Sequence, residues 1–286
     1  MKKVIRIIVF IIVVLVSTYF EIELVLTLTD PWGLKYFDDL ATIWDKSVES
    51  SNRGYVLPPG TYQFSHWQVT ELQNSVRLLP DNASGPCQVL FLGDSVEWGH
   101  GVNDKETWVN LIAGQLHQVN AINASFDGYN SENVRRGLAG FPDAKVVVYL
   151  INGNDSDPTF GWSNGWPRQP HLSMLDKYVR YFTLARGKPE ASIASGIGAT
   201  VEDADKVRFR DDIQTLANDK RVVLISFEGD FEPAFDAEFN IRVIPHYKNR
   251  VSSADAHPNA EGNKELTTSI LPLVRDAVAQ QCPSNS

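Results

Sequence analysis

Short apolar runs alternate with amphipathic segments over the C-terminal two-thirds of the chain. Runs rich in Val, Ile and Leu predict five buried strands, over Gln88–Gly93, Ala121–Phe126, Lys145–Ile151, Arg221–Phe227 and Ile241–Pro245. Apolar residues at helical spacing predict helices over Glu106–Val119, Ser131–Leu138, Asp205–Asn218 and Ala260–Gln280. The strands are apolar on both faces and alternate with helices. This pattern indicates an α/β fold, with three layers (α/β/α) built on a mostly parallel five-stranded sheet.

The N-terminus has a different pattern. Lys2, Lys3 and Arg6 precede an almost unbroken apolar stretch from Ile7 to Phe20. The stretch lies at the short end for a membrane-spanning helix, and it also fits the apolar region of a cleaved signal peptide. Because no small-residue cleavage site follows it, we expect residues 1–28 to be an uncleaved, single-pass signal anchor. Either alternative places the rest of the chain outside the cytoplasm, as a membrane-anchored or a secreted protein.

The remaining residues divide into two parts. Residues 29–86 are rich in aromatic residues, Pro and Gly, and they predict a membrane-proximal extension with one helix near Phe37–Val48. Residues 87–282 form the α/β domain. Within it, residues 156–203 are far longer than an ordinary connection between a strand and a helix. They carry seven aromatic or histidine side chains: Phe160, Trp162, Trp166, His171, Tyr178, Tyr181 and Phe182.

Two interpretations of this insertion stay open. One is a lid or substrate platform over the site. The other is an inserted helix pair whose aromatic side chains are ordinary core.

Composition and charge narrow the classes of partner. The chain has 286 residues, 43% of them hydrophobic, which is enough for a sizeable core. Its net charge of −9, and the absence of a basic run after the first six residues, argue against a nucleic-acid partner.

The chain has only two cysteines, Cys87 and Cys282, and they flank the α/β domain. We expect a disulfide between them in an oxidising compartment, with two free thiols as the alternative. Their spacing does not fit a metal site.

Polar motifs stand where the predicted strands end. Gly93-Asp94-Ser95 follows the first strand, Asn123 to Gly128 follows the second, and Asn152 to Asp155 follows the third. His257-Pro258 precedes the last helix. Because the carboxyl ends of parallel strands share one edge of a sheet, these groups can meet there. Together they offer a hydroxyl nucleophile, an imidazole and hydrogen-bond donors for an oxyanion, which is the chemistry of acyl transfer.

These four blocks resemble those of the SGNH hydrolases, also called the GDSL esterase and lipase family. The resemblance covers residues 87–282 and implies a flavodoxin-like fold. It also implies roles: Ser95 as nucleophile, His257 as general base, and an oxyanion hole formed by the amides of Ser95 and Gly128 and the side chain of Asn154. It implies no metal and no organic cofactor.

Two positions depart from the family pattern. Asn152 stands where the family usually has Gly. In the last block the usual carboxylate position holds Ala254, and Asp255 lies one residue later. We expect Asp255 to orient His257 and complete a catalytic triad, with a Ser–His dyad as the alternative.

The expected function is therefore that of an extracytoplasmic serine ester hydrolase, an acyl or acetyl esterase acting through an acyl-serine. It has two expected partners. One is an ester substrate, such as an acylated glycan or lipid, and the other is the membrane that holds residues 1–28. One alternative is an O-acetyltransferase or deacetylase of cell-envelope polysaccharide. A more distant alternative is a non-catalytic glycan-binding module.

Overall fold

A computed structural model describes residues 2–157, 172–184 and 203–282 of the chain. The chain forms two compact units. The smaller unit contains residues 1–41, 169–198 and 252–255, and the larger unit contains the remainder. Of the aromatic residues noted in the insertion, Phe160, Trp162, Trp166 and His171 lie outside the described residues, so the lid interpretation rests on residues that the structure does not describe.

A parallel five-stranded sheet forms the centre of the larger unit. Its strand order is β6-β5-β7-β8-β9, and every neighbouring pair is parallel. The strands are β5 (Cys87–Phe91), β6 (Val119–Asn123), β7 (Val146–Ile151), β8 (Val222–Phe227) and β9 (Arg242–Ile244). This order is that of flavodoxin-like doubly wound sheets, so the predicted α/β fold is confirmed.

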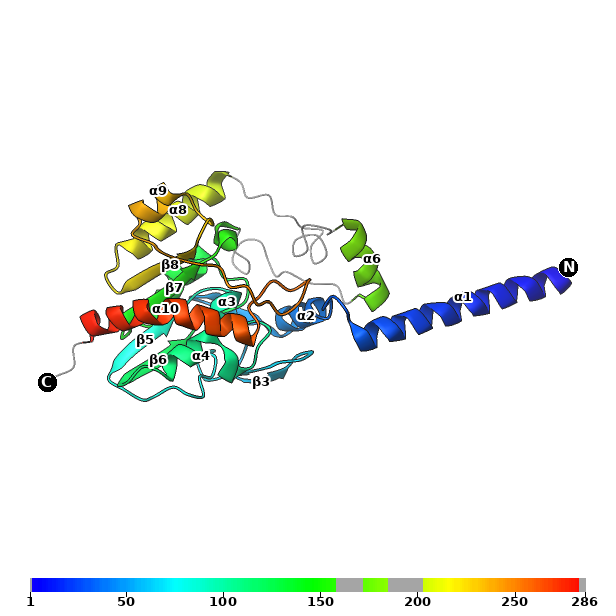
Figure 1. Ribbon diagram of the computed structural model, residues 1–286, viewed down its shortest axis with the longest axis horizontal. Helices are drawn as coiled ribbons and strands as arrows, with labels where there is room; N and C mark the ends of the chain where they lie inside the picture. The colour runs from blue at the N-terminus through cyan, green and yellow to red at the C-terminus, as the bar shows by residue number, and fades with distance from the viewer. Residues whose placement is uncertain (1, 158–171, 185–202, 283–286) are drawn as a thin grey trace. The chain divides into compact units, whose positions relative to one another are not determined.

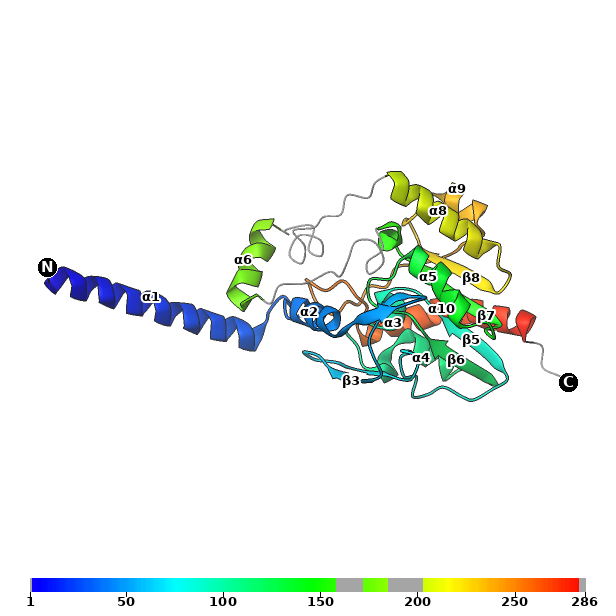
Figure 2. The same cartoon turned by 180° about the vertical axis from the view of Figure 1, so that it is seen from behind.

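Helices cover both faces of this sheet. They are α3 (Ser95–Trp98), α4 (Trp108–Ala113), α5 (Ser131–Gly137), α8 (Asp203–Ala217), α9 (Pro233–Glu238) and α10 (Ala260–Gln281). Helices α4 and α10 lie over the near face in Figure 1, and α5 and α8 lie over the other face in Figure 2. Strand β7 is buried at every residue, as expected for a central strand covered on both sides.

The core between α4, α10 and the sheet is large and apolar. It includes Phe91 and Val148 from the sheet, Ile112 from α4, and Ile270 and Val274 from α10. Burial of apolar area on this scale is the dominant stabilising term of such a domain.

Two predicted elements have wrong boundaries, one helix and one strand. The helix expected over Glu106–Val119 ends at Ala113, because Gly114 caps it and Gln118 then adopts a left-handed turn before β6. The second strand begins at Val119 instead of Ala121 and ends at Asn123, because Val119 pairs with Cys87 at the start of β5.

Residues 29–86 contain more structure than the one predicted helix. Helix α2 (Tyr36–Lys46) is followed by two antiparallel hairpins. Their strands are β1 (Val48–Ser50), β2 (Gly54–Val56), β3 (Gly60–Gln63) and β4 (Gln68–Glu71). Just after the second hairpin, Arg77 forms a bridge with Asn123 at the end of β6. The second hairpin therefore lies beside the carboxyl edge of the main sheet.

The described residues of the larger unit also form three short 3-10 helices: η1 (Asp104–Glu106), η2 (Leu138–Gly140) and η3 (Gly153–Ser156).

The smaller unit contains α1 (Lys2–Thr29), the first part of α2, and α6 (Met174–Leu184). Helix α1 has 28 residues with a mean hydropathy of 2.4 in its most apolar window, and none of its residues is buried. By length and composition it can span a membrane, although a signal sequence meets the same criteria.

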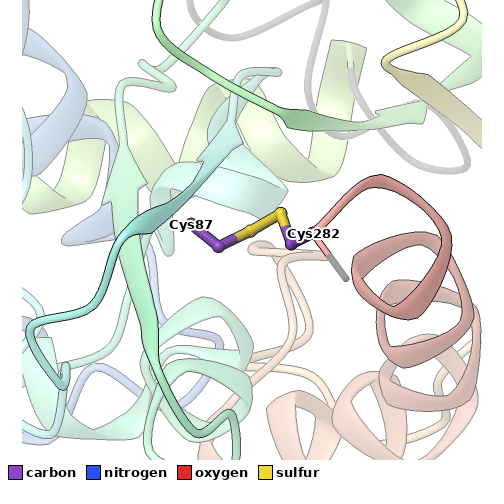
Figure 3. Close-up of a disulfide and its surroundings, with 2 residues drawn as sticks. All are labelled: Cys87 and Cys282. Carbon is purple, nitrogen blue, oxygen red and sulfur yellow. A yellow bond between two sulfur atoms is a disulfide. The ribbon is translucent and has the colours of Figure 1, made fainter. Parts of the chain in front are cut away.

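A disulfide joins Cys87 at the start of β5 to Cys282 just after α10, with 5.8 Å between the two Cα atoms (Figure 3). The predicted pairing of the two cysteines is therefore confirmed. The bond closes a loop of 195 residues around the sheet. A covalent link over so long a loop restricts the unfolded chain and so stabilises the folded domain.

Candidate active site

The candidate nucleophile lies on a sharp turn between β5 and α3. Asp94 is the N-cap of α3, and its side chain accepts a hydrogen bond from the amide of Val96 at 2.8 Å. Ser95 is therefore the first residue of the helix, at the carboxyl end of a central strand. A Cβ on Gly93 would lie 2.1 Å from Oε1 of Glu97, so only glycine fits at the turn.

His257 reaches this turn from the loop before α10. Its Nε2 lies 2.7 Å from Oγ of Ser95, which is hydrogen-bonding distance. The backbone carbonyl of His257 accepts a hydrogen bond from the amide of Val251 at 2.9 Å, and Asn259 then caps α10. A serine and an imidazole from opposite ends of the domain thus meet with the geometry of a nucleophile and its general base.

The two other predicted oxyanion donors follow β6 and β7, the strands on either side of β5. Gly128 follows β6 and has a φ of +73°, in the left-handed region. A Cβ there would lie 3.1 Å from both the Tyr55 hydroxyl and the Trp44 ring, so the backbone comes close to this aromatic pair. Asn154 lies in η3, directly after β7, and its side chain is exposed. The roles of both residues stay predictions.

Asp255 belongs to the smaller unit, whereas Ser95 and His257 belong to the larger one. Asp255 is buried, its amide donates to Oγ of Ser252 at 3.0 Å, and its carbonyl accepts from the amide of Ser252 at 3.1 Å. These bonds form a tight turn just before His257. The role of Asp255 as the third member of a triad stays a prediction.

Sequence reasoning missed a second imidazole–carboxylate pair beside the site. Nδ1 of the buried His100 is hydrogen-bonded to Oδ2 of Asp127. The ring of His100 stacks on the ring of His257, with 4.5 Å between centroids and 25° between planes. His100 therefore supports one face of the candidate base. The only signal in the sequence was its position five residues after Ser95, which does not distinguish it from a loop residue.

Three buried acids lie beneath the nucleophile turn, and we call Asp94, Glu97 and Asp155 the carboxyl cluster. The three acids lie close enough to affect one another's pKa values. Burial raises the pKa of Glu97 well above its usual value, and the neighbouring Asp94 and Asp155 raise it further. Burial likewise raises the pKa of Asp94, to about 6.

The same cluster connects the nucleophile turn to the end of β7. Oε1 of Glu97 accepts a hydrogen bond from the amide of Leu150 at 2.6 Å. Oδ2 of Asp155 accepts from the amide of Asn152 at 2.9 Å and from the Tyr149 hydroxyl at 2.7 Å. Burial raises the pKa of Asp155 well above its usual value. The departure at Asn152 is thus accommodated, because its amide is held by the carboxylate three residues later.

A second group of buried charges, which we call the arginine cluster, consists of Glu71, Arg77 and Asp104. The guanidinium of Arg77 donates to Oδ1 of Asp104 at 2.9 Å. It also donates to the carbonyls of Trp98, Gly99 and Val102, at 2.5 to 2.6 Å. Arg77 therefore holds the loop that follows α3 and carries His100.

Glu71 completes the arginine cluster by accepting a hydrogen bond from the indole Nε1 of Trp98 at 2.7 Å. Burial raises the pKa of Glu71 to about 7, although Arg77 and the Trp98 hydrogen bond oppose that shift. Both Glu71 and Arg77 come from the extension before residue 87, in which the sequence showed no motif.

Comparisons with known proteins agree with this architecture. The family described as "GDSL-like Lipase/Acylhydrolase family" matches residues 91–265, which is more than half of the chain. None of the curated proteins matches the chain.

Similar solved structures include TesA, at 14% identity and a TM-score of 0.41, covering 66% of this chain and 99% of that one. A carbohydrate acetylesterase family member from Sinorhizobium meliloti is 14% identical with a TM-score of 0.42, covering 68% of this chain and 99% of that one. A family two carbohydrate esterase from Cellvibrio japonicus is 14% identical with a TM-score of 0.38, covering 71% of this chain and 64% of that one.

The family match spans both the turn that carries Ser95 and the loop that carries His257. The chain therefore belongs to the GDSL-like lipase/acylhydrolase family and is a carboxylic ester hydrolase of the SGNH type.

Proposed function

We propose that the chain is a membrane-anchored, extracytoplasmic serine esterase that acts through an acyl-serine intermediate. The observation that carries this proposal is the 2.7 Å separation of His257 Nε2 and Ser95 Oγ. At this distance the imidazole can take the hydroxyl proton as the oxygen attacks an ester carbonyl.

The first half of the reaction forms the acyl-enzyme. Ser95 Oγ bonds to the carbonyl carbon, its proton passes to His257, and the carbonyl oxygen becomes an oxyanion. Amides of Ser95 and Gly128 and the side chain of Asn154 stabilise that charge in our proposal, each donor being worth roughly 3–4 kcal/mol. The tetrahedral intermediate then expels the alcohol, which takes the proton from His257 as the carbon–oxygen bond breaks.

The second half of the reaction regenerates the serine. His257 takes a proton from water, and the resulting hydroxide attacks the acyl carbon. The second tetrahedral intermediate releases the carboxylic acid, and the proton returns to Ser95. Asp255 orients the His257 ring and stabilises its charged form in this scheme.

Two features support a location outside the cytoplasm. The disulfide between Cys87 and Cys282 is typical of oxidising compartments. Helix α1 is apolar along its length and carries Lys2, Lys3 and Arg6 at its start, which is typical of the cytoplasmic end of a span.

The mechanism is tested by replacing the nucleophile. In Ser95→Ala we expect hydrolysis of p-nitrophenyl acetate to fall by at least about 10⁴-fold and labelling by a fluorophosphonate to disappear, with an unchanged melting temperature. Ser51→Ala, at an exposed serine, is the matched control and should keep both the hydrolysis and the fluorophosphonate labelling. Turnover and labelling that survive in Ser95→Ala would refute the acyl-serine mechanism.

The third member of the triad has its own test. If Asp255 orients His257, Asp255→Asn lowers kcat by about 10²- to 10⁴-fold with little change in KM. Asp127→Asn, which alters the hydrogen bond to His100, is the comparison and should have a smaller effect on kcat. A larger loss in Asp127→Asn would assign the orienting carboxylate to the His100 pair.

The acceptor of the acyl group is decided by the same assay. For a hydrolase, the acid is released at the rate at which the alcohol is released, and added polysaccharide changes neither rate. If added glycan lowers the release of free acetate and becomes acetylated, the proposed hydrolysis is replaced by O-acetyl transfer with the same Ser95 and His257.

A further inference from the structure

Helix α6, the described part of the long insertion, is fastened to α1 at a definite level. The Glu23 carboxylate accepts hydrogen bonds from the amides of Met174 at 2.6 Å and Leu175 at 2.8 Å. A side chain of α1 thus caps the first turn of α6, and in both views one end of α6 lies beside the C-terminal end of α1 (Figures 1 and 2). Glu23 is three residues beyond Phe20, about 5 Å along the helix axis.

The opposite side of α6 is held by charged contacts within the same unit. Nζ of the buried Lys177 lies 2.5 Å from Oδ1 of Asp38. The Tyr178 hydroxyl lies 3.4 Å from Oδ1 of Asp30. These contacts bury one face of α6, so the opposite face has a fixed orientation.

Beside that buried face, two large apolar side chains of α6 are exposed. Val179 is 53% exposed and Phe182 is 45% exposed, and they lie three residues apart on one side of the helix. The Trp32 ring packs edge-on against Phe182, with 5.1 Å between centroids, and is itself 36% exposed. We call Trp32, Val179 and Phe182 the α6 apolar face.

The surface of α1 continues this apolar face. No residue of α1 is buried, and the side chains just after Glu23 are also apolar and exposed: Leu24, Val25 and Leu28. A helix that is apolar on all sides requires an apolar solvent. With 28 residues, α1 is about 42 Å long, which exceeds a hydrocarbon core of about 30 Å and leaves its last residues at headgroup level.

We propose that the α6 apolar face lies in the headgroup region of the bilayer leaflet from which α1 emerges. This inference rests on the proposed anchoring by α1. The cap by Glu23 sets α6 at that level, Trp is the side chain that favours this region, and an amphipathic helix there buries only one face. The smaller unit is thereby held against the lipid surface.

The experiment uses the full chain in lipid nanodiscs that contain one copy each. An environment-sensitive fluorophore is attached to Phe182→Cys or to the control Arg180→Cys, an exposed position about 160° around the helix from 182. The native cysteines do not react because they form a disulfide. We expect brominated acyl chains to quench the label at 182 at least about threefold more than the label at 180, and iodide in water to show the reverse order.

A second pair of variants tests the surface itself, with the label at 182 in both. Val179→Asp should abolish the quenching by brominated lipid, because it places a charge on the α6 apolar face. Arg180→Asp, at an exposed position on the other side of the helix, should retain it. Equal access of iodide to the labels at 182 and 180 would overturn the inference.

Three further outcomes can be distinguished. If the label at 182 is protected only in nanodiscs that hold two copies, a second copy covers the face and the inference is wrong. If alkaline carbonate extracts the protein from membranes, the anchoring by α1 fails, and this inference fails with it while the esterase mechanism stands. If α1 remains embedded but iodide in water quenches the label at 182, only this inference fails.

Discussion

The arginine cluster and the carboxyl cluster both lie next to the nucleophile turn, yet they compensate buried charge in different ways. In the arginine cluster, the cation of Arg77 faces Asp104 and lowers the pKa of Glu71, which still rises to about 7. In the carboxyl cluster, no Lys or Arg side chain is hydrogen-bonded to the three acids in the described residues. Burial raises the pKa values of Glu97 and Asp155, and neighbouring carboxylates raise them further.

The difference shows what a cation does inside a buried group of acids. With Arg77 present, burial is compensated by charge, and the cluster binds three carbonyls of the following loop. Without a cation, burial is compensated by a proton, because the neutral carboxyl is less costly to bury than the carboxylate. The stability of both arrangements should therefore depend on pH, through Glu71 in the first and through Glu97 in the second.

Removal of the cation should have the largest effect. Arg77→Met leaves Asp104 and three backbone carbonyls without their donor, and we expect the free energy of unfolding to fall by about 3–5 kcal/mol. Urea denaturation measures this loss. The control is Arg210→Met, whose ion pair with Glu238 is about half exposed, and it should cost at most about 1 kcal/mol. Equal losses in the two variants would contradict the role given to Arg77.

The next largest effect should come from removing the carboxyl of Glu97. Glu97→Ala leaves the amide of Leu150 unpaired and should cost about 1–3 kcal/mol of stability at pH 7, with a lower kcat because the Ser95 turn loses its support. Glu97→Gln keeps an acceptor for Leu150 and carries no charge, so it should retain stability within about 1 kcal/mol. If Gln is as damaging as Ala, Glu97 acts as an anion and its neutral form is refuted.

The pH dependence of stability should separate Glu97→Gln from the wild type. Because the pKa of Glu97 is raised in the folded state, the folded protein keeps a proton that the unfolded chain loses near pH 4.5. The stability that this proton confers is present below that pH and is lost as the pH rises toward the folded pKa. Gln does not titrate, so the fall in melting temperature from pH 5 to pH 8 should be smaller in the variant. Identical falls would show that Glu97 is ionised in the folded protein.

A further effect of pH should come from Glu71 in the arginine cluster. Its pKa rises from 4.5 to about 7, so the wild type should lose stability only between these values, by at most about 1.4 kcal/mol per pH unit. Glu71→Gln still accepts the Trp98 hydrogen bond and lacks this slope. The free energy of unfolding at pH 5 and pH 7.5 checks it, with Glu238→Gln as the exposed control. If the free energy of unfolding of Glu71→Gln depends on pH as strongly as that of the wild type, a group other than Glu71 causes the pH dependence.

The α/β pattern could be predicted because it is local. Each central strand is a short apolar run with its own turn signals, and the motif at Ser95 stands directly behind one of them. The segment before residue 87 could not be predicted in the same way. Its hairpins have strands of only three or four residues, too short for a periodic pattern, and they are specified by contacts such as that of Arg77 with Asn123.

The pair of His100 and Asp127 shows the same limit at the site. The two residues are 27 positions apart, and no motif links them. Their hydrogen bond exists because the loops after β5 and β6 lie side by side at one edge of the sheet.

The sequence by itself determined the strand-and-helix alternation, the nucleophile turn at Ser95 and the histidine before the last helix, because hydrophobic periodicity and turn chemistry are properties of neighbouring residues. Only the tertiary structure decided that His257 lies 2.7 Å from Ser95, that Arg77 supports the loop after α3, and that Glu97 is buried beside Asp94 and Asp155. Those distances, and the burial that shifts each pKa, depend on how separate elements pack, and packing is a property of the whole chain.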